Sequence, residues 1–219
     1  MILAGGRASR VDGEPKPLFE VGGRTLLHRA VEASRGAIRA SRGAIDAAGD
    51  VAPQPDAAED GHERFVTVVA PVLDPALDVD WVREDPPFGG PAAATIAALD
   101  AWAARGFVPD LVLLLASDLP RVESAVAVLC DGILLAPSDI DGLCLADASS
   151  RPQWLTGIYR TASLLRAAAR VPDAGRDASM RALLDDLAIS VVAVADEIVD
   201  DVDTWEDLAR ARAACEEIT

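Results

Sequence analysis

The sequence predicts an α/β protein with a three-layer, Rossmann-like fold, in which a mostly parallel sheet carries helices on both faces. Short apolar runs alternate with longer stretches rich in alanine, leucine and arginine, which is typical of repeated strand–helix units. The run Leu111–Ala116 is apolar throughout, as expected for a strand buried in such a sheet. The chain has 219 residues, of which 51% are hydrophobic, so we expect one large domain over residues 1–219.

Each expected strand is a short apolar run. The strands are Ile2–Ala4, Phe65–Ala70, Asp80–Arg83, Leu111–Ala116, Gly142–Ala146, Trp154–Tyr159 and Ser190–Ala195. The expected helices are Thr25–Arg35, Pro91–Ala104, Val122–Cys130, Thr161–Ala169, Arg176–Leu187 and Thr204–Glu216. The first strand is short, yet we expect it inside the sheet rather than at an edge. Residues 33–38 recur as residues 40–45, a seven-residue step that indicates a duplicated helical segment. The Pro- and acid-rich stretch Val51–Glu63 predicts a surface loop.

Composition excludes several classes of function. A net charge of −16 opposes binding to nucleic acid and to anionic membranes. We find no apolar run long enough to cross a bilayer and no signal peptide at the start. The three cysteines are widely spaced, which suits a reducing cytoplasm. Two histidines are too few for a histidine-rich metal site. Lysine and arginine together number 20, and Lys16 is the only lysine, so this position uses a compact ammonium where the chain otherwise uses guanidinium.

The first candidate site follows the first strand. Leu3-Ala4-Gly5-Gly6 leads through Ser9-Arg10 and Gly13 to Lys16. Two glycines at the end of a strand expose backbone N–H groups and let a phosphate approach closely, and Arg10 and Lys16 add positive charge. The segment is neither a Walker A loop nor the dinucleotide fingerprint. The structural alternative is a tight turn followed by a solvated basic loop.

The second candidate is Asp118, which lies just after the expected buried strand Leu111–Ala116 and is followed by Leu119-Pro120. A carboxylate at the carboxyl end of a strand is a suitable hard ligand for Mg²⁺ on a triphosphate. Its structural alternative is to cap the following helix or turn. Near the C-terminus, Asp203 or Thr204 is expected to cap the last helix.

The segment from Leu3-Ala4-Gly5-Gly6 through Ser9-Arg10 and Gly13 to Lys16 resembles the signature loop of nucleotidyltransferases with a sugar-nucleotide-transferase fold. Within them the chain most resembles the molybdenum cofactor guanylyltransferases, which join GMP from GTP to molybdopterin and release pyrophosphate. The resemblance covers nearly the whole chain. It departs from the family pattern at Val11-Asp12, where the family often has Met-Gly, and at Pro15, where it often has Asp.

The resemblance implies roles for individual residues. Nucleotide binding falls to Leu3, Ala4, Gly5, Gly6, Arg10, Lys16, Asp85 and Asp118. The catalytic residues are Arg10, Lys16 and Asp118. The cofactor is Mg²⁺, with Asp118 and Asp203 as ligands, and Asp201 belongs to the same acidic pair near the metal or acceptor. Asp85 would accept hydrogen bonds from the N1–H and N2–H₂ edge of guanine.

The acceptor side is implied by the same resemblance. The strand Gln153–Tyr159 would line it, although Trp154 and Tyr159 fit equally well as core aromatics. Arg176 and Arg181 would contact an anionic acceptor or lie on a solvated helix face. A phosphate monoester acceptor is already ionised near neutral pH, so no strong general base is required. The partners implied are GTP and a molybdopterin-type small molecule. The alternatives are CTP as donor, a sugar or alditol phosphate as acceptor, or a nucleotide-binding module without turnover.

Overall fold

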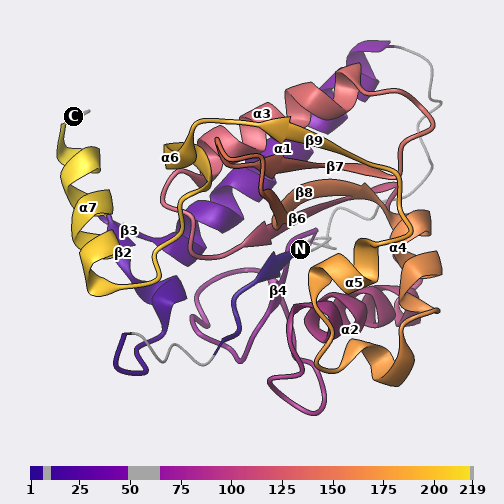
Figure 1. Cartoon of the computed structure of the whole chain (residues 1–219), viewed down its shortest axis with the longest axis horizontal. Coiled ribbons are helices and arrows are strands. Elements are labelled where there is room, and N and C mark those ends of the chain that lie inside the picture. The colour runs from indigo at the N-terminus through magenta and orange to yellow at the C-terminus, as the bar shows by residue number, and fades with distance from the viewer. Residues whose placement is uncertain (7–10, 49–64, 218–219) are drawn as a thin grey trace.

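The structure is a computed structural model that describes residues 1–6, 11–48 and 65–217. A seven-stranded sheet runs through its middle in the order β5-β4-β1-β6-β8-β7-β9 (Figure 1). The strands are β1 (Ile2–Leu3), β4 (Thr67–Val69), β5 (Asp80–Val82), β6 (Leu111–Ala116), β7 (Gly142–Ala146), β8 (Pro152–Arg160) and β9 (Ile189–Ala193). Only β8 runs antiparallel to its neighbours in this sheet. The mostly parallel sheet is therefore confirmed, and each expected strand occurs with small shifts at its ends.

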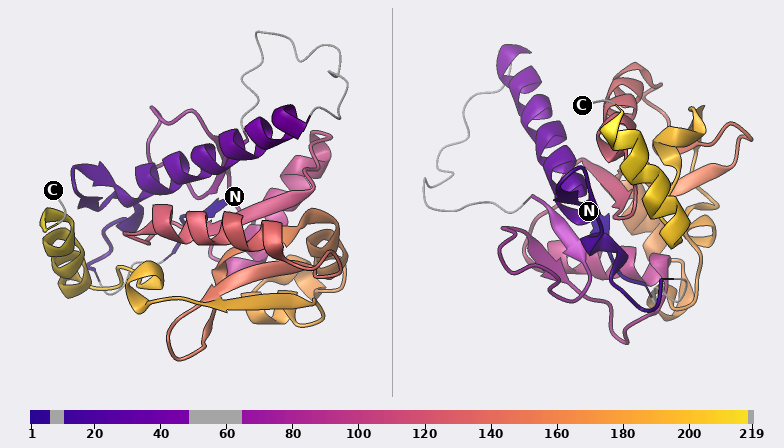
Figure 2. Two further views of the ribbon diagram at one scale, coloured as in Figure 1. Left: turned by 90° about the horizontal axis from the view of Figure 1, so that it is seen from above. Right: turned by 90° about the vertical axis from the view of Figure 1, so that its left-hand side faces the viewer.

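Helices cover both faces of the sheet, which confirms the three-layer fold (Figures 1 and 2). One core cluster contains residues of α1 (Leu26–Ala48), α3 (Val122–Leu135) and α6 (Asp196–Val199). Figure 2 shows α1 and α3 running side by side on this face. A second cluster contains residues of α2 (Pro91–Ala104), α4 (Thr161–Ala168) and α5 (Met180–Leu184). Ile2 belongs to the first cluster and Leu3 to the second, and successive strand residues point to opposite faces, so the clusters lie on opposite sides of the sheet.

The C-terminal helix α7 (Trp205–Glu216) packs apart from the main layers. It covers a hairpin of β2 (Glu20–Val21) and β3 (Arg24–Thr25) that the sequence analysis did not predict. The turn of the hairpin uses Gly22 and Gly23 with φ of 59° and 74°, which suits a tight two-residue connection. A Cβ at Gly22 would lie 2.5 Å from the Sγ of Cys215, which shows that α7 packs directly against this turn. Docking of α7 brings the segment 201–208 beside residues 11–19 in a third core cluster.

The first strand lies inside the sheet, as predicted. β1 pairs in parallel with both β4 and β6, although it has only two residues. Two backbone bonds extend the pairing, from Ala4 N to Val69 O at 3.2 Å and from Ser117 N to Leu3 O at 3.1 Å. Because β1, β4, β5 and β6 are parallel, the loops that follow them meet at one edge of the sheet.

Two helix predictions were wrong at their ends. α1 does not stop at Arg35 but continues through the seven-residue repeat to Ala48, because Ala37 and Ile38 still pack against the core. The expected helix Arg176–Leu187 is wrong over its first turn. Asp177 has φ of 58°, which a right-handed helix does not allow, and Ser179 caps the much shorter α5.

The remaining differences are smaller. α3 runs to Leu135 rather than Cys130, and α6 was not predicted. Two short 3₁₀ helices also occur, η1 (Lys16–Leu18) and η2 (Pro172–Gly175). The predicted surface loop Val51–Glu63 lies outside the described residues. Among the helices that the structure describes, none has the length and apolar character needed to cross a membrane.

Candidate active site

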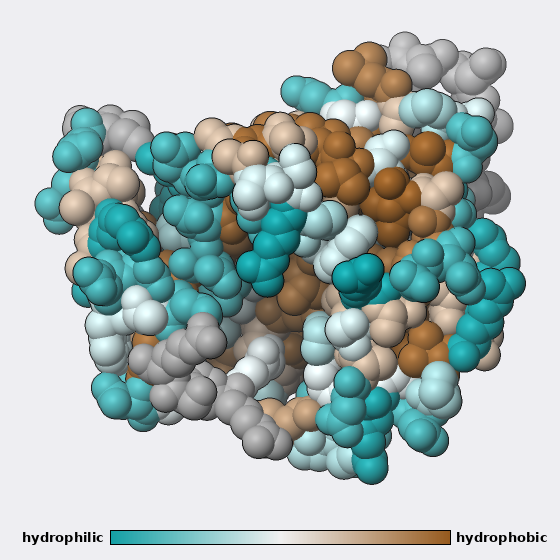
Figure 3. Space-filling view, viewed as in Figure 1, coloured by the Kyte–Doolittle hydropathy of each residue, from teal (hydrophilic) through white to brown (hydrophobic). Residues whose placement is uncertain are grey.

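A pocket of about 690 Å³ lies at the carboxyl ends of β1, β4, β5 and β6. We call it the glycine pocket because Gly5 and Gly6 form part of its wall. Lys16 and Asp203, from distant parts of the chain, line it as well. Figure 3 shows that this face of the molecule is hollowed near its centre. The volume lies in the usual range for small-molecule sites, and the location is the one where open α/β sheets bind ligands.

A second pocket of about 870 Å³ adjoins the first. We call it the Trp154 pocket. It is lined by Gln153 and Trp154 of β8 and by Arg181 of α5. Four residues line both pockets, namely Pro91, Ala116, Asp118 and Leu155. A ligand in either pocket therefore lies against Asp118.

Three carboxylates gather where the pockets meet. Oxygen atoms of Asp118, Asp201 and Asp203 all lie within 4.8 Å of one another. The backbone holds the cluster together, because Val202 N donates to the carbonyl oxygen of Asp118 at 3.0 Å. The prediction from resemblance named Asp118 and Asp203 as metal ligands, and the structure brings these two together. It adds Asp201 as a third candidate ligand. The spacing Asp201-x-Asp203 was a usable signal, because alternate residues of an extended segment point to the same side.

The carboxylates of the cluster raise the pKa of one another. Burial, followed by the neighbouring carboxylate of Asp201, raises the pKa of Asp118 to about 6, and Lys16 opposes the shift. Partial removal from water, followed by the charge of Asp203, likewise raises the pKa of Asp201. Oxygen donors that repel one another in this way suit a hard divalent cation such as Mg²⁺. The residues present therefore fit the metal that the resemblance implies.

Lys16 stands between the cluster and the glycine pocket. It begins η1, and its ammonium group forms an ion pair with Asp203 while lining the pocket. Its side chain is only 16% exposed, so the charge is partly shielded from water. This places the only lysine of the chain where it can reach an anionic ligand in the pocket.

The glycine loop leaves room beside the pocket. Among the described residues, a Cβ at Gly6 would meet no other atom within 4 Å, and one at Gly5 would meet only the carbonyl oxygen of Val69 at 3.6 Å. The packing of the described part of the chain therefore does not demand glycine at either position. Close approach of a ligand to the exposed backbone is a physical reason for both glycines. Arg10, predicted to bind phosphate, lies outside the described residues.

The loop between β5 and α2 contributes a different acid from the one predicted. Glu84 lines the glycine pocket, whereas Asp85 is exposed and is absent from the lining. The Glu84 carboxylate accepts a hydrogen bond from Phe88 N at 2.9 Å. α2 begins at Pro91, as predicted, and its Gly90 N-cap offers no side-chain partner. The partly positive start of this helix therefore faces the border of both pockets.

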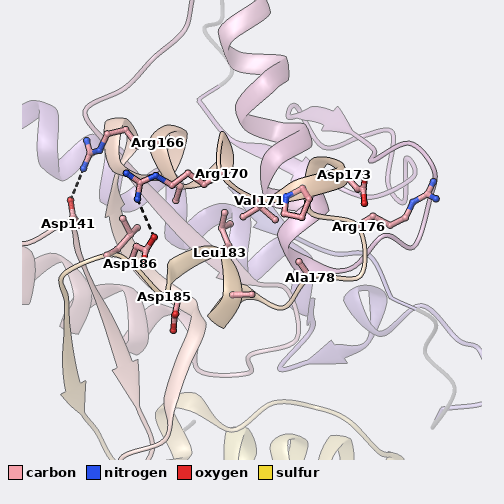
Figure 4. Close-up of a pocket in the computed structure, with 14 residues that line it drawn as sticks. Asp141, Arg166, Arg170, Val171, Asp173, Arg176, Ala178, Leu183, Asp185 and Asp186 are labelled. Atoms are coloured by element: carbon pink, nitrogen blue, oxygen red, sulfur yellow. Dashed lines mark hydrogen bonds and ion pairs between the residues drawn. The ribbon is translucent and has the colours of Figure 1, made fainter.

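The predicted acceptor-side residues separate into three environments. Trp154 and Arg181 line the Trp154 pocket. Tyr159 is fully buried, and its hydroxyl donates to the carbonyl oxygen of Trp154 at 2.8 Å, so it is a core aromatic. Arg176 lines another cavity of about 570 Å³ that does not include the carboxylate cluster (Figure 4). In that cavity Arg166 and Arg170 pair with acidic side chains, which offsets their charge.

Comparison with known proteins agrees with this fold. The family described as "MobA-like NTP transferase domain" matches residues 1–192. A molybdenum cofactor guanylyltransferase of Rhodopseudomonas palustris is 33% identical over 128 residues, which cover 58% of this chain and 51% of the relative. The chain thus spans about half the length of that relative. A probable molybdenum cofactor guanylyltransferase of Synechococcus elongatus is 30% identical over 74% of this chain and 71% of its own length.

A solved structure shares the fold. The molybdopterin-guanine dinucleotide biosynthesis protein A of Archaeoglobus fulgidus superposes with a TM-score of 0.58 over 99% of this chain and 97% of its own. Its sequence identity is 18%, so this similarity concerns the fold alone.

Proposed function

Because the chain belongs to the MobA-like NTP transferase domain family, and is thus a nucleotidyltransferase, we propose that it transfers GMP from GTP to a molybdopterin-type phosphate with the help of Mg²⁺. Pyrophosphate is the second product. The observation that carries the proposal is the position of Asp118, which borders both pockets and belongs to the carboxylate cluster. A site that joins two ligands needs such a meeting point.

The glycine pocket is the donor site in this proposal. Gly5 and Gly6 present backbone to the triphosphate, and Lys16 and Arg10 supply positive charge to its β- and γ-phosphates. Lys16 supports this assignment because its ammonium group already lies in the pocket wall. Catalysis then rests on positioning and on stabilising the charge that moves to the leaving pyrophosphate.

The carboxylate cluster is the metal site. Asp118, Asp201 and Asp203 would hold Mg²⁺, which when bound offsets phosphate charge. Because Asp118 borders both pockets, a triphosphate bound at the cluster would lie at the border of the two pockets. Lys16 balances part of their charge from the other side through its contact with Asp203.

The Trp154 pocket is the acceptor site. Arg151 and Arg181 supply cations for a phosphate monoester, and Trp154 supplies a flat apolar wall. The acceptor phosphate attacks the α-phosphorus of GTP in line, a new phosphorus–oxygen bond forms, and the bond to pyrophosphate breaks.

All three cysteines are free thiols, which supports a reducing cytoplasm as the compartment.

A nucleotide panel tests the proposal. Melting temperatures are measured with GTP, CTP, UTP and ATP, each with and without Mg²⁺, since a ligand that binds only the folded state raises the melting temperature. Pyrophosphate release is then followed with molybdopterin and, as the competing acceptor class, a sugar phosphate. We expect the largest shift with GTP and Mg²⁺, and release only with molybdopterin. A larger shift with CTP would change the donor. Nucleotide binding with no release from any acceptor would leave a binding module.

A further inference from the structure

We propose that Trp205 is a positioning residue, which holds the turn before Lys16 and so sets where Lys16 meets the triphosphate. The inference rests on the proposed function. It concerns the side chain of Trp205 and its two contacts on either side of Lys16, namely Asp12 and Phe19.

The turn before Lys16 is built to present Asp12. Glu14 N donates to the carbonyl oxygen of Val11 at 2.9 Å, which closes a four-residue turn. Its two central residues, Asp12 and Gly13, have φ of 54° and 80°. Asp-Gly suits such a turn, because glycine adopts positive φ freely and aspartate tolerates it. The Val11 side chain is fully buried in the third core cluster, so the turn is anchored beneath while Asp12 stays exposed above.

Trp205 contacts the chain around Lys16 from the solvent side. Its indole N–H donates to the Asp12 carboxylate at 3.1 Å. Its ring stacks on Phe19 with centroids 5.0 Å apart and an interplanar angle of 30°. Phe19 N in turn donates to the carbonyl oxygen of Lys16 at 3.0 Å, at the end of η1. One side chain thus contacts the chain both before and after Lys16.

Trp205 is itself held relative to the carboxylate cluster. It is the first residue of α7, whose start is closed by a reciprocal capping box between Thr204 and Asp207. The residue before the cap is Asp203, the ion-pair partner of Lys16. The contacts of Trp205 therefore help to fix the distance between Lys16 and Asp203.

A role confined to docking α7 accounts less well for these contacts. The indole is 46% exposed, so burial of its ring is incomplete. Other groups dock the helix further along: Leu208 is buried in the third cluster, and Arg212 Nε donates to the carbonyl oxygen of Glu20 at 2.9 Å. Arg212 therefore offers a matched control on the same helix, away from the Lys16 turn.

The test compares Trp205→Phe, Asp12→Gly, their double variant, Asp12→Asn and Arg212→Ala with the wild type. Phenylalanine keeps the stack on Phe19 but lacks the N–H donor. Glycine keeps the positive φ but lacks the acceptor. The amide oxygen of asparagine still accepts the bond. GTP with Mg²⁺ is titrated by calorimetry, and hydrogen exchange of a peptide spanning residues 11–18 is followed in the nucleotide-free protein.

We expect Trp205→Phe and Asp12→Gly each to weaken nucleotide affinity about fivefold, the order of one hydrogen bond, and to speed exchange of this peptide. The double variant should be no weaker than either single one, because both remove the same bond. Asp12→Asn should retain affinity, and the KM for the acceptor should not change. Arg212→Ala should lower the melting temperature and leave affinity and exchange of the turn as in the wild type.

Wild-type affinity and exchange in Trp205→Phe and Asp12→Gly would overturn the inference alone. Equal weakening by Arg212→Ala would overturn it as well, because docking of α7 would then be the cause. If the wild type itself binds no nucleotide with Mg²⁺, the proposed function fails and the inference with it.

Discussion

The amide of Val202 donates a hydrogen bond of 3.0 Å to the carbonyl oxygen of Asp118. This bond joins the loop after β6 to the extended segment before α7. Because Asp201 and Asp203 flank Val202, it brings their carboxylates toward that of Asp118. The bond uses backbone groups only, so the carboxylates can be replaced singly without removing the bond that assembles the cluster.

Lys16→Ala should weaken GTP binding in the presence of Mg²⁺ by on the order of tenfold or more, the effect of losing a charged hydrogen-bond donor. The ammonium group lies in the wall of the glycine pocket and pairs with Asp203. Arg105→Ala is the control, because Arg105 pairs with Asp80 away from the pocket lining. Calorimetric titration measures both variants. Unchanged affinity in folded Lys16→Ala would remove the phosphate role.

Arg181→Ala should raise the KM for the acceptor several-fold and leave the affinity for GTP unchanged. Arg181 lines the Trp154 pocket and not the glycine pocket. The matched control is Arg176→Ala, whose side chain lines the separate cavity shown in Figure 4. Pyrophosphate release is measured across a range of acceptor concentrations. A larger effect from Arg176 than from Arg181 would place the acceptor in that other cavity.

How far the site was predictable depends on where its contacts come from. Asp118 was found because a buried strand and a following proline mark its position locally, and the first strand was recognised from its short apolar run. Asp201 was named beside Asp203 by the resemblance, and the spacing Asp201-x-Asp203 is a local signal, but the approach of both to Asp118 depends on the Val202–Asp118 bond. The Asp12–Trp205 pair joins opposite ends of the chain. No local pattern encodes these two long-range contacts. The family pattern favoured Asp85 as the residue that binds the guanine base. In the structure Glu84 lines the glycine pocket and Asp85 does not.

A polypeptide that begins at Met1 should show a pH dependence of stability that comes from the buried start of β1. In the chain numbered from Met1, the α-amino group donates to the carbonyl oxygen of Leu113 at 2.8 Å, and burial lowers its pKa from 8.0 to about 5. Unfolding restores the higher pKa, so the unfolded state binds more protons between pH 5 and 8 and stability should rise with pH across this window. An upstream extension converts the amine to an amide and should abolish the rise. Urea unfolding of both proteins at several pH values measures it. A rise that persists in the extended protein would assign it to another group.

Asp118→Asn should stabilise the metal-free protein at neutral pH. Burial raises the pKa of Asp118 in the folded state to about 6, above its ordinary value of 3.8. The folded state therefore binds more protons between these values, so stability falls as pH rises from about 4 to 6 and stays lower above. Asparagine removes this loss, which is at most about 3 kcal/mol. Asp139→Asn, at an exposed position, controls for net charge. Thermal unfolding with a chelator at pH 4 and pH 7 measures the difference. Equal gains at both pH values would contradict the assignment.

The same substitution should have the opposite effect on turnover. Asp118 borders both pockets and lies within 4.8 Å of two further carboxylates, so its charge acts where the α-phosphate meets the acceptor. Its backbone is held by the Val202 bond on one side and by the buried strand β6 on the other, and asparagine disturbs neither. We expect Asp118→Asn to fold normally and to retain part of its GTP binding through the glycine loop and Lys16.

Pyrophosphate release by Asp118→Asn should fall by on the order of a hundredfold or more, comparable to the loss of a preorganised charge-stabilising group. The residual activity should require more Mg²⁺, because the missing carboxylate weakens the hold on the ion rather than the approach of the acceptor. Release is therefore assayed across a Mg²⁺ titration, with Asp201→Asn in parallel as a second member of the cluster. A shifted Mg²⁺ dependence in both variants would identify one shared metal site. Wild-type turnover with an unshifted dependence in Asp118→Asn would mean that Asp118 only shapes the border between the pockets and that the metal is held elsewhere.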